Sequence, residues 1–246
     1  MTTLLSNDHF QIIQQNQTTF SIEFPIYSET IIQSITKSRI LLGTTITNDF
    51  HTLIFKASTV KTLPQFKQQL SIANGKATLP IALAAKLAAD LGSQLKYMIT
   101  IFNMTIFGFS PENIIVIDDS KFIYLSSEYL TEINKRNSTI MLCFPIDFKT
   151  IFTAPELFQI KEIPSFIHFK VSYYSYGLLL LYALIEDKYF YDNYVRGKEN
   201  KKEKVPLRNE KIHEYLQSLS IKETKLFWFI ERCLVLEPES RSILFL

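Results

Sequence analysis

The sequence predicts an α+β fold, and three observations lead to this prediction. Most of the β-prone runs lie in the first quarter of the 246 residues, whereas the clearest helical patterns come later in the chain. An apolar content of 47% is enough to bury a large core, either as one bilobal domain or as two small ones. Neither an internal repeat nor a separate second domain is visible in the sequence.

Composition argues against several classes of function. The 26 Lys and Arg residues balance 24 Asp and Glu, and a net charge of +2 is too small for a nucleic-acid partner. Cys143 and Cys233 lack the spacing of a disulfide framework or a zinc site, so we expect a reducing, cytoplasmic location. The first residues lack a signal peptide, and the longest apolar run, 173–185, is too short to span a bilayer. We expect this run to be a buried core helix and the protein to bind no membrane.

The first third of the chain is predicted to contain two strand pairs and a helix. Residues 10–26 hold two β-prone runs around a Gln-Asn-Gln turn, and residues 39–56 read as strand, Asn-Asp turn and strand. Residues 28–38 predict a short helix with Ser28 as its N-cap. Its apolar side chains recur on one face: Ile31, Ile32 and Ile35.

Later segments predict helices and one hairpin. Residues 79–98 form the clearest helix, with a buried stripe of leucines at Leu83, Leu87, Leu91 and Leu95. Residues 114–125 predict a hairpin whose turn is Asp118-Asp119-Ser120; we interpret the two carboxylates as turn formers rather than metal ligands. Residues 220–234 predict a helix that starts with a capping box of Ser220 and Glu223.

Three motifs carry a resemblance to a known family. Residues 110–116, SPENIIV, resemble the Lys-Pro-Glu-Asn-Ile-Leu-Val segment of the catalytic loop of Ser/Thr protein kinases. Residues 153–157, TAPEL, resemble the kinase Ala-Pro-Glu motif, and residues 170–184 resemble the kinase helix that carries Asp-Val-Tyr-Ser-Leu-Gly. With a long helix predicted before the first motif, their order and separation are similar to those of the family from residue 20 to the end.

The resemblance implies a single bilobal kinase-like domain, with a reduced N-terminal β lobe over residues 1–56 and a helical C-lobe over residues 57–246. Since fewer than ten residues precede the first hairpin, we expect the family's first strand and glycine loop to be absent or vestigial. Phe55, Lys56 and Ala57 take the place of the hinge that contacts a nucleotide. In an alternative alignment Lys56 would be the phosphate-binding Lys of the third strand, but the chain that follows is too short for it.

The same resemblance implies that the catalytic residues are missing. Gly108 takes the place of the catalytic Asp, Ser110 that of the phosphate-contacting Lys, and Ser126 that of the metal-binding Asp. Only Asn113, at the place of the second metal ligand, keeps the family's residue type. Glu23 stands where the third strand has its Lys, and an acid there would repel polyphosphate. We therefore expect no catalytic residues, no metal site and no ATP or Mg²⁺ as cofactor.

Other family positions are structural. Ala154, Pro155 and Glu156 form the Ala-Pro-Glu motif, and the resemblance predicts a buried ion pair between Glu156 and Arg241. Ser172 stands in place of the Asp that ties down the backbone of the catalytic loop.

Together these features predict a pseudokinase, an inactive kinase-like scaffold or allosteric regulator that binds another protein, either an active kinase or an assembly. The expected docking surfaces are the activation segment, residues 129–153, and the aromatic run 189–194, since Tyr is enriched at interface hot spots. The basic run 196–204 reads as a solvated loop. The alternative is an atypical nucleotide-binding kinase with weak phosphotransfer activity.

Overall fold

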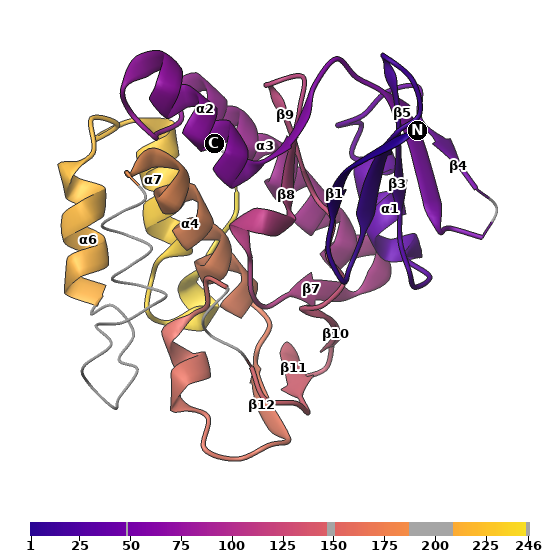
Figure 1. Ribbon diagram of the computed structural model, residues 1–246. Helices are drawn as coiled ribbons and strands as arrows, with labels where there is room; N and C mark the ends of the chain where they lie inside the picture. The colour runs from indigo at the N-terminus through magenta and orange to yellow at the C-terminus, as the bar shows by residue number, and fades with distance from the viewer. Residues whose placement is uncertain (48, 147–150, 187–208, 245–246) are drawn as a thin grey trace. The chain divides into compact units, whose positions relative to one another are not determined.

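The chain forms a mixed α+β structure in a computed structural model, which describes residues 1–47, 49–146, 151–186 and 209–244 (Figure 1). These residues divide into two compact units. The first unit contains Met1–Phe66, Lys86–Met104 and Pro111–Leu130, and the second contains Lys67–Ala85, Thr105–Ser110 and Thr131–Leu246. The two-lobe division expected at residue 56 stays a prediction. Among the described residues, no helix has both the length and the apolar character needed to cross a bilayer.

An antiparallel sheet of five strands opens the first unit (Figure 1). Its strands in spatial order are β1 (Thr2–Ser6), β2 (Gln11–Gln14), β3 (Thr19–Glu23), β5 (Thr52–Lys56) and β4 (Thr45–Ile46). The predicted hairpin of residues 10–26 and the predicted strand pair of residues 39–56 are both confirmed. The family's first strand was expected to be absent or vestigial; a five-residue strand, residues 2–6, pairs antiparallel with β2. Five residues are enough for an edge strand, since only one neighbour has to be paired.

Helix α1 (Glu29–Lys37) follows β3 and lies against this sheet (Figure 1). Ile31, Ile32 and Ile35 are fully buried, as the apolar pattern predicts. The predicted N-cap position is right, but the capping hydrogen bond does not form. Ser28 occupies the N-cap position, but its hydroxyl donates to the carbonyl of Ile26 at 2.8 Å and makes no hydrogen bond to the first turn.

A three-stranded sheet and part of a long helix complete the first unit. The sheet has the order β6 (Val60–Thr62), β8 (Ile114–Ile117), β9 (Lys121–Tyr124), and it confirms the predicted hairpin of residues 114–125. Helix α3 (Ile81–Tyr97) continues into a π-helical turn (Met98–Phe102). Of its predicted leucine stripe, Leu87, Leu91 and Leu95 are buried. Leu83, near the helix start, is only partly buried.

Two polar residues on α3 join it to β9, and the apolar pattern did not reveal them. Gln94 is buried, and its carboxamide makes two hydrogen bonds with the backbone of Tyr124, at 2.8 and 2.9 Å. Asp90 accepts from the N–H of Phe122 at 3.1 Å and pairs with Lys86 at 2.6 Å. Burial raises the pKa of Asp90, although these two partners oppose the shift. The side chains therefore satisfy backbone groups of β9 that the sheet leaves unpaired.

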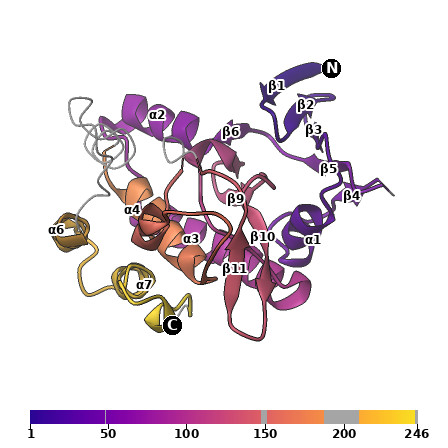
Figure 2. The same cartoon turned by 90° about the horizontal axis from the view of Figure 1, so that it is seen from below.

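The second unit combines a four-stranded sheet with several helices (Figure 2). The sheet order is β12 (Ser165–His168), β11 (Thr139–Leu142), β10 (Leu130–Asn134), β7 (Met104–Ile106). The helices are most of α2 (Leu63–Asn74), the 3-10 helix Pro155–Gln159, α4 (Val171–Leu184), α6 (Asn209–Ser218), α7 (Lys225–Cys233) and the 3-10 turn Pro238–Ser240. Residues 189–194 and 196–204, predicted as an aromatic docking patch and a solvated loop, lie outside the described residues.

Helix α4 is the core of this unit. Every residue from Val171 to Ala183 is buried, which confirms the predicted core helix. Gly177 allows a close approach to α7, because a Cβ at this position would lie 2.8 Å from the Cβ of Cys233. At the end of α4, the fully buried Lys67 donates to the carbonyls of Tyr182 and Ile185, at 2.5 and 3.0 Å. The lysine thereby satisfies carbonyls that the helix terminus leaves without intrahelical partners.

Helix α7 begins later than predicted. Thr224 is its N-cap, accepting from the N–H of Phe227 at 3.2 Å, so the capping box of Ser220 and Glu223 is wrong. Glu223 has a left-handed backbone (φ 67°), which is incompatible with a helical turn. The expected apolar face is largely present: Leu226, Phe227, Phe229 and Ile230 are buried, whereas Leu234 is partly exposed.

Candidate functional site

The resemblance puts the nucleotide-binding hinge at Phe55, Lys56 and Ala57, which are the last two residues of β5 and the residue after it. Phe55 is buried and stacks on Phe20 with ring centroids 5.8 Å apart, and Lys56 ends the strand with its side chain exposed. Ala57 donates its N–H to the carbonyl of Thr18 at 3.0 Å.

The next two donors meet the carboxylate of Asp118, at the tip of the hairpin formed by β8 and β9. Ser58 donates its N–H to Asp118 Oδ1 at 2.6 Å, and the N–H of Thr59 lies 3.5 Å from the same oxygen. Partial burial alone would raise the pKa of Asp118, but hydrogen bonds from Ser58, Lys121 and Thr59 together lower it. A hinge contacts adenine through such backbone groups. Of the three N–H groups that have protein acceptors here, that of Ala57 belongs to the predicted hinge and those of Ser58 and Thr59 follow it.

The hairpin tip matches its predicted role as a turn. Asp118 and Asp119 both adopt the left-handed conformation, with φ of 51° and 54°, which short polar side chains tolerate. Asp119 also pairs with Lys61 at 2.8 Å. Among the described residues, no group of three or more His, Cys, Asp or Glu side chains could hold a metal ion.

The turn between β1 and β2 contacts Asn113, which the resemblance puts at the place of a metal ligand, and Glu128, two residues after Ser126. Asn7 Nδ2 lies 3.4 Å from Asn113 Oδ1, and His9 Nε2 lies 2.9 Å from Glu128 Oε2. The oxygen of the Asn7 carboxamide accepts the N–H groups of His9 and Phe10, both at 2.9 Å, so the turn is fixed by its own side chain. We call the four residues Asn7, His9, Asn113 and Glu128 the β1–β2 clasp.

The clasp leaves the metal-binding positions engaged with protein groups. Asn113 is only 4% exposed, and its carbonyl accepts the N–H of Leu125 at 3.1 Å. Ser126, in place of the metal-binding Asp, is fully buried, and its hydroxyl accepts the N–H of Glu128 at 3.1 Å. A carboxamide and a hydroxyl are weak ligands for Mg²⁺, which is usually held by carboxylates together with substrate phosphates.

In the second unit, a side chain at Gly108, which the resemblance puts at the place of the catalytic Asp, would require Ile151 to move. A Cβ on Gly108 would lie 2.6 Å from Cδ1 of Ile151, a distance that real Cβ contacts essentially never show. Ser110, in place of the phosphate-contacting Lys, is 7% exposed. Between them, Phe109 exchanges two backbone hydrogen bonds with Phe152, at 3.2 and 2.8 Å, so the loop is held in an extended conformation.

A serine of α4 ties down this loop, but it is not the predicted one. Ser172 donates to the carbonyl of Phe169 at 3.0 Å, within its own helix start. Ser175 donates to the carbonyl of Phe107 at 2.9 Å. The hydrogen bond to the loop that was expected from Ser172 is therefore made by Ser175, because Ser175 lies on the face of α4 that meets the loop.

The predicted pairing of Glu156 with Arg241 is confirmed, although only the arginine is buried and the Glu156 side chain is 20% exposed. The guanidinium meets both carboxylate oxygens, at 2.5 and 3.0 Å, and Arg241 is 1% exposed. Its remaining donors reach the carbonyls of Val235, Leu236 and Lys170, at 2.7, 2.8 and 3.3 Å. Ala154 is fully buried at the N-cap of the following 3-10 helix, and Pro155 opens it. The pair ties the 3-10 helix to the segment around Arg241.

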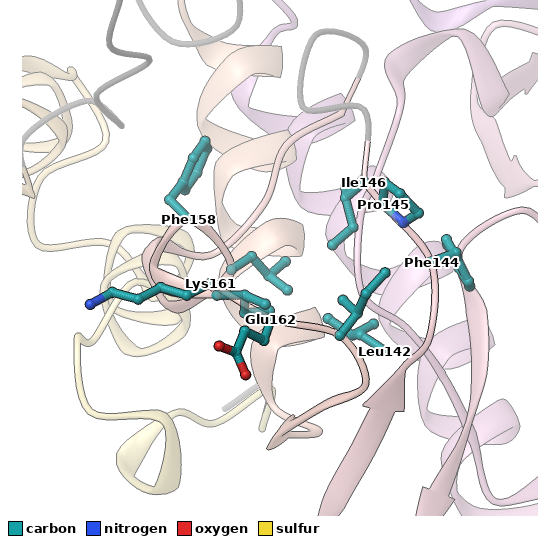
Figure 3. Close-up of a pocket in the computed structure, with 10 residues that line it drawn as sticks. Leu142, Phe144, Pro145, Ile146, Phe158, Lys161 and Glu162 are labelled. Carbon is teal, nitrogen blue, oxygen red and sulfur yellow. The ribbon is translucent and has the colours of Figure 1, made fainter.

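Residues 129–153, which the resemblance assigns as an activation segment, contain the β10–β11 hairpin and border a hollow of about 420 Å³ (Figure 3). Most of its wall is apolar and comes from two segments: Leu142, Phe144, Pro145 and Ile146 at and after the end of β11, and Leu157, Phe158, Ile160 and Ile163 in and after the 3-10 helix. Figure 3 shows the charged ends of Lys161 and Glu162 pointing away from Leu142 and Ile146. Residues 147–150 of this segment lie outside the described residues.

Comparison with known proteins assigns no family. No protein-family model matches this chain, and no curated protein matches it significantly. The function has to be argued from the geometry of the sites themselves.

Sequence reasoning missed the partners that occupy the candidate positions. The Asn-Asp-His sequence of residues 7–9 was a usable signal for the clasp, because Asn before a short polar run commonly forms a side-chain-stabilised turn. The partner of that turn, more than 100 residues away, has no signal in a single sequence. The contact of Asp118 with the N–H groups of Ser58 and Thr59 likewise has no signal in a single sequence.

Proposed function

We propose that this protein is a pseudokinase: a degenerate protein kinase-like chain that binds another protein as a scaffold or allosteric regulator and transfers no phosphate. One observation carries the proposal. The residues at the places of the catalytic and nucleotide-binding groups are either too small for the chemistry or engaged by neighbouring protein groups.

Support for the kinase-like part of the proposal comes from the order of the elements. The resemblance predicts, in sequence, a hairpin, a short helix, a strand pair, a long helix, a loop with Pro-Glu-Asn and a hairpin, and each of these elements forms. The ion pair between Glu156 and Arg241 links residues 85 positions apart, and the resemblance alone predicted it. A chance match of short motifs gives no reason for this pair.

Support for the inactive part comes from the chemistry that phosphoryl transfer requires. A general base contributes typically 10² to 10⁴ in rate, and Gly108 has no side chain to serve as one. Metal ions must neutralise charge on the transferred phosphate. At the two metal-ligand positions, the side chain of Asn113 is hydrogen-bonded to Asn7, and Ser126 stands in place of a carboxylate. The N–H groups of Ala57 and Ser58 already have protein acceptors. Each deficit removes a different contribution to the rate.

The proposed partner is another protein, either an active kinase or an assembly. The near-zero net charge speaks against nucleic acid, and the activation segment exposes large apolar side chains that suit a protein interface.

A thermal shift with ATP, with and without Mg²⁺, tests the proposal. We expect no shift at millimolar ATP, whereas a ligand at a hundred times its Kd would stabilise the protein by about 2.7 kcal/mol. The matched variant is Asn113→Ala. A shift in the wild-type protein that Asn113→Ala abolishes, together with detectable ATP turnover, would contradict the proposal and favour the atypical kinase.

A further inference from the structure

We propose that the outer edge of β12 binds one short extended segment of a partner protein, which adds a fifth strand to the four-stranded sheet and inserts an apolar side chain into the neighbouring hollow. The inference rests on the proposed scaffold function and names its docking surface. We call the edge of β12 and the hollow together the β12 surface.

The edge supplies backbone groups for a new strand. Strand β12 is the terminal strand of its sheet, and within the described residues it pairs only with β11, over four residue pairs from Thr139 with His168 to Leu142 with Ser165. A terminal strand presents unpaired N–H and C=O groups, which another chain can join. None of the four residues of β12 is a Lys, Arg, Asp or Glu, the side chains that usually keep such an edge from pairing.

Exposed apolar side chains continue from the edge across the sheet. Phe166 on β12 is 61% exposed, and its cross-strand neighbour Met141 on β11 is 48% exposed. Ile163 and Phe144, which line the hollow, are each 45% exposed. Exposed large apolar side chains at the strand edge and at the hollow are typical of a protein-binding site.

The hollow lies at the start of β12. Leu142, which pairs with Ser165, lines it together with Ile163, two residues before the strand. A volume of about 420 Å³ lies near the lower end of the range for ligand pockets, so it suits one or two large side chains. In strand addition, main-chain hydrogen bonds give affinity and such pockets give side-chain specificity.

The size of the surface selects a peptide rather than a second copy of this chain. A stable interface between folded proteins buries roughly 1,200–2,000 Å² in total. A four-residue strand is only about 13 Å long, and with four exposed apolar side chains it falls short of that area. A single extended segment needs no more than this length.

Basic residues near β12 indicate that the bound segment carries an acidic residue. The turn between β10 and β11 carries Lys135 and Arg136, both exposed. Ser138, in the same turn, accepts the N–H of Phe169 at 2.9 Å, so the basic turn lies at the end of β12 opposite the hollow. We therefore expect a segment that has a large apolar residue at one end and an Asp or Glu at the other, because opposite charges favour this register.

A displayed library of random octapeptides, selected on the immobilised full chain, tests the proposal. We expect enrichment of peptides with an apolar residue and an acid about four residues apart. Synthetic versions of the enriched peptides should bind the Phe166→Lys and Ile163→Asp variants at least tenfold more weakly than the wild-type protein, as measured by fluorescence anisotropy. The charge-reversed double variant Lys135→Glu with Arg136→Glu should lose affinity for acidic peptides and favour basic ones.

The matched control is Ile72→Lys, because Ile72 is an 82% exposed isoleucine on α2, outside the β12 surface. Circular dichroism of every variant separates lost binding from lost folding. Failure to enrich any peptide, or equal loss in the Ile72→Lys control, would overturn the inference. A concentration-dependent dimer in sedimentation that Phe166→Lys dissolves would also overturn it, since the occupant would then be a second copy.

These results are distinguishable from failure of the proposed function. If no peptide binds and the protein also shows no ATP shift, the docking surface is wrong but the scaffold proposal stands. If ATP turnover is found, the scaffold proposal fails whatever the peptides do.

Discussion

The ion pair between Glu156 and Arg241 and the β1–β2 clasp are two polar sites with very different surroundings. Arg241 is almost wholly buried, and its guanidinium donates to two carboxylate oxygens and three carbonyls. In the clasp, the side chains of His9 and Glu128 remain 27% and 38% exposed, and the carboxamides of Asn7 and Asn113 meet at 3.4 Å.

The two sites differ in how much they contribute to the stability of the fold. A buried charge must be fully paired, so the ion pair is an obligatory part of the fold. A half-exposed pair contributes little to stability, because water competes for both partners. The residues of this chain that match the kinase pattern best are those that the core requires, and the substituted ones stand where the family does its chemistry.

The largest expected effect is that of Arg241→Ala. It leaves the Glu156 carboxylate and three carbonyls without their partner, and we expect a loss of about 3 kcal/mol or more in the free energy of unfolding. Urea denaturation measures it. Glu156→Gln should cost less, because an amide can still accept from the guanidinium. Arg136→Ala, at an exposed arginine, should stay within about 0.5 kcal/mol. Equal losses for Arg241→Ala and Arg136→Ala would break the comparison.

A smaller effect is expected at the place of the catalytic Asp. The new methyl group of Gly108→Ala would meet Cδ1 of Ile151, the mobile end of a side chain, so we expect a loss of about 1 kcal/mol. Ile151→Val removes that atom. The double variant should therefore be less destabilised than the sum of the two single variants in a double-mutant cycle. If the losses in free energy of unfolding of the two single variants simply add, the contact with Ile151 is not the cause of the loss in Gly108→Ala.

The smallest effect is expected in the clasp. His9→Ala should change the free energy of unfolding by less than about 1 kcal/mol, because both partners of the pair are partly exposed. Amide hydrogen exchange at His9 and Phe10 should nevertheless become faster, since the turn loses its contact with Glu128. His213→Ala, at an exposed histidine of α6, is the control. A loss as large as that of Arg241→Ala would mean that the clasp is part of the core.

Several elements could be predicted because their signal is local. The alternation of residues 10–26, the apolar face of α1 and the apolar run of α4 each follow from the period of their secondary structure. Boundaries were less predictable where two local signals compete. Ser220 with Glu223 and Thr224 are both acceptable helix starts, and the left-handed backbone at Glu223 selects the second.

The candidate site divides in the same way. The sequence alone supplies the residue types at Gly108, Ser110 and Ser126, the positions that the resemblance compares with charged groups of kinases. It could not anticipate that Ser175 would hold the loop in place of Ser172, since the orientation of α4 decides which of its serines faces Phe107.

The sequence by itself determined the α+β class and the burial of α4, because these depend on residue type and short-range spacing. Only the tertiary structure decided that Asn7 meets Asn113, that Asp118 accepts the N–H of Ser58, and that an apolar hollow lies beside an exposed strand edge. Contacts between residues 60 or more positions apart depend on how whole elements pack, and packing is a property of the complete core rather than of any local pattern.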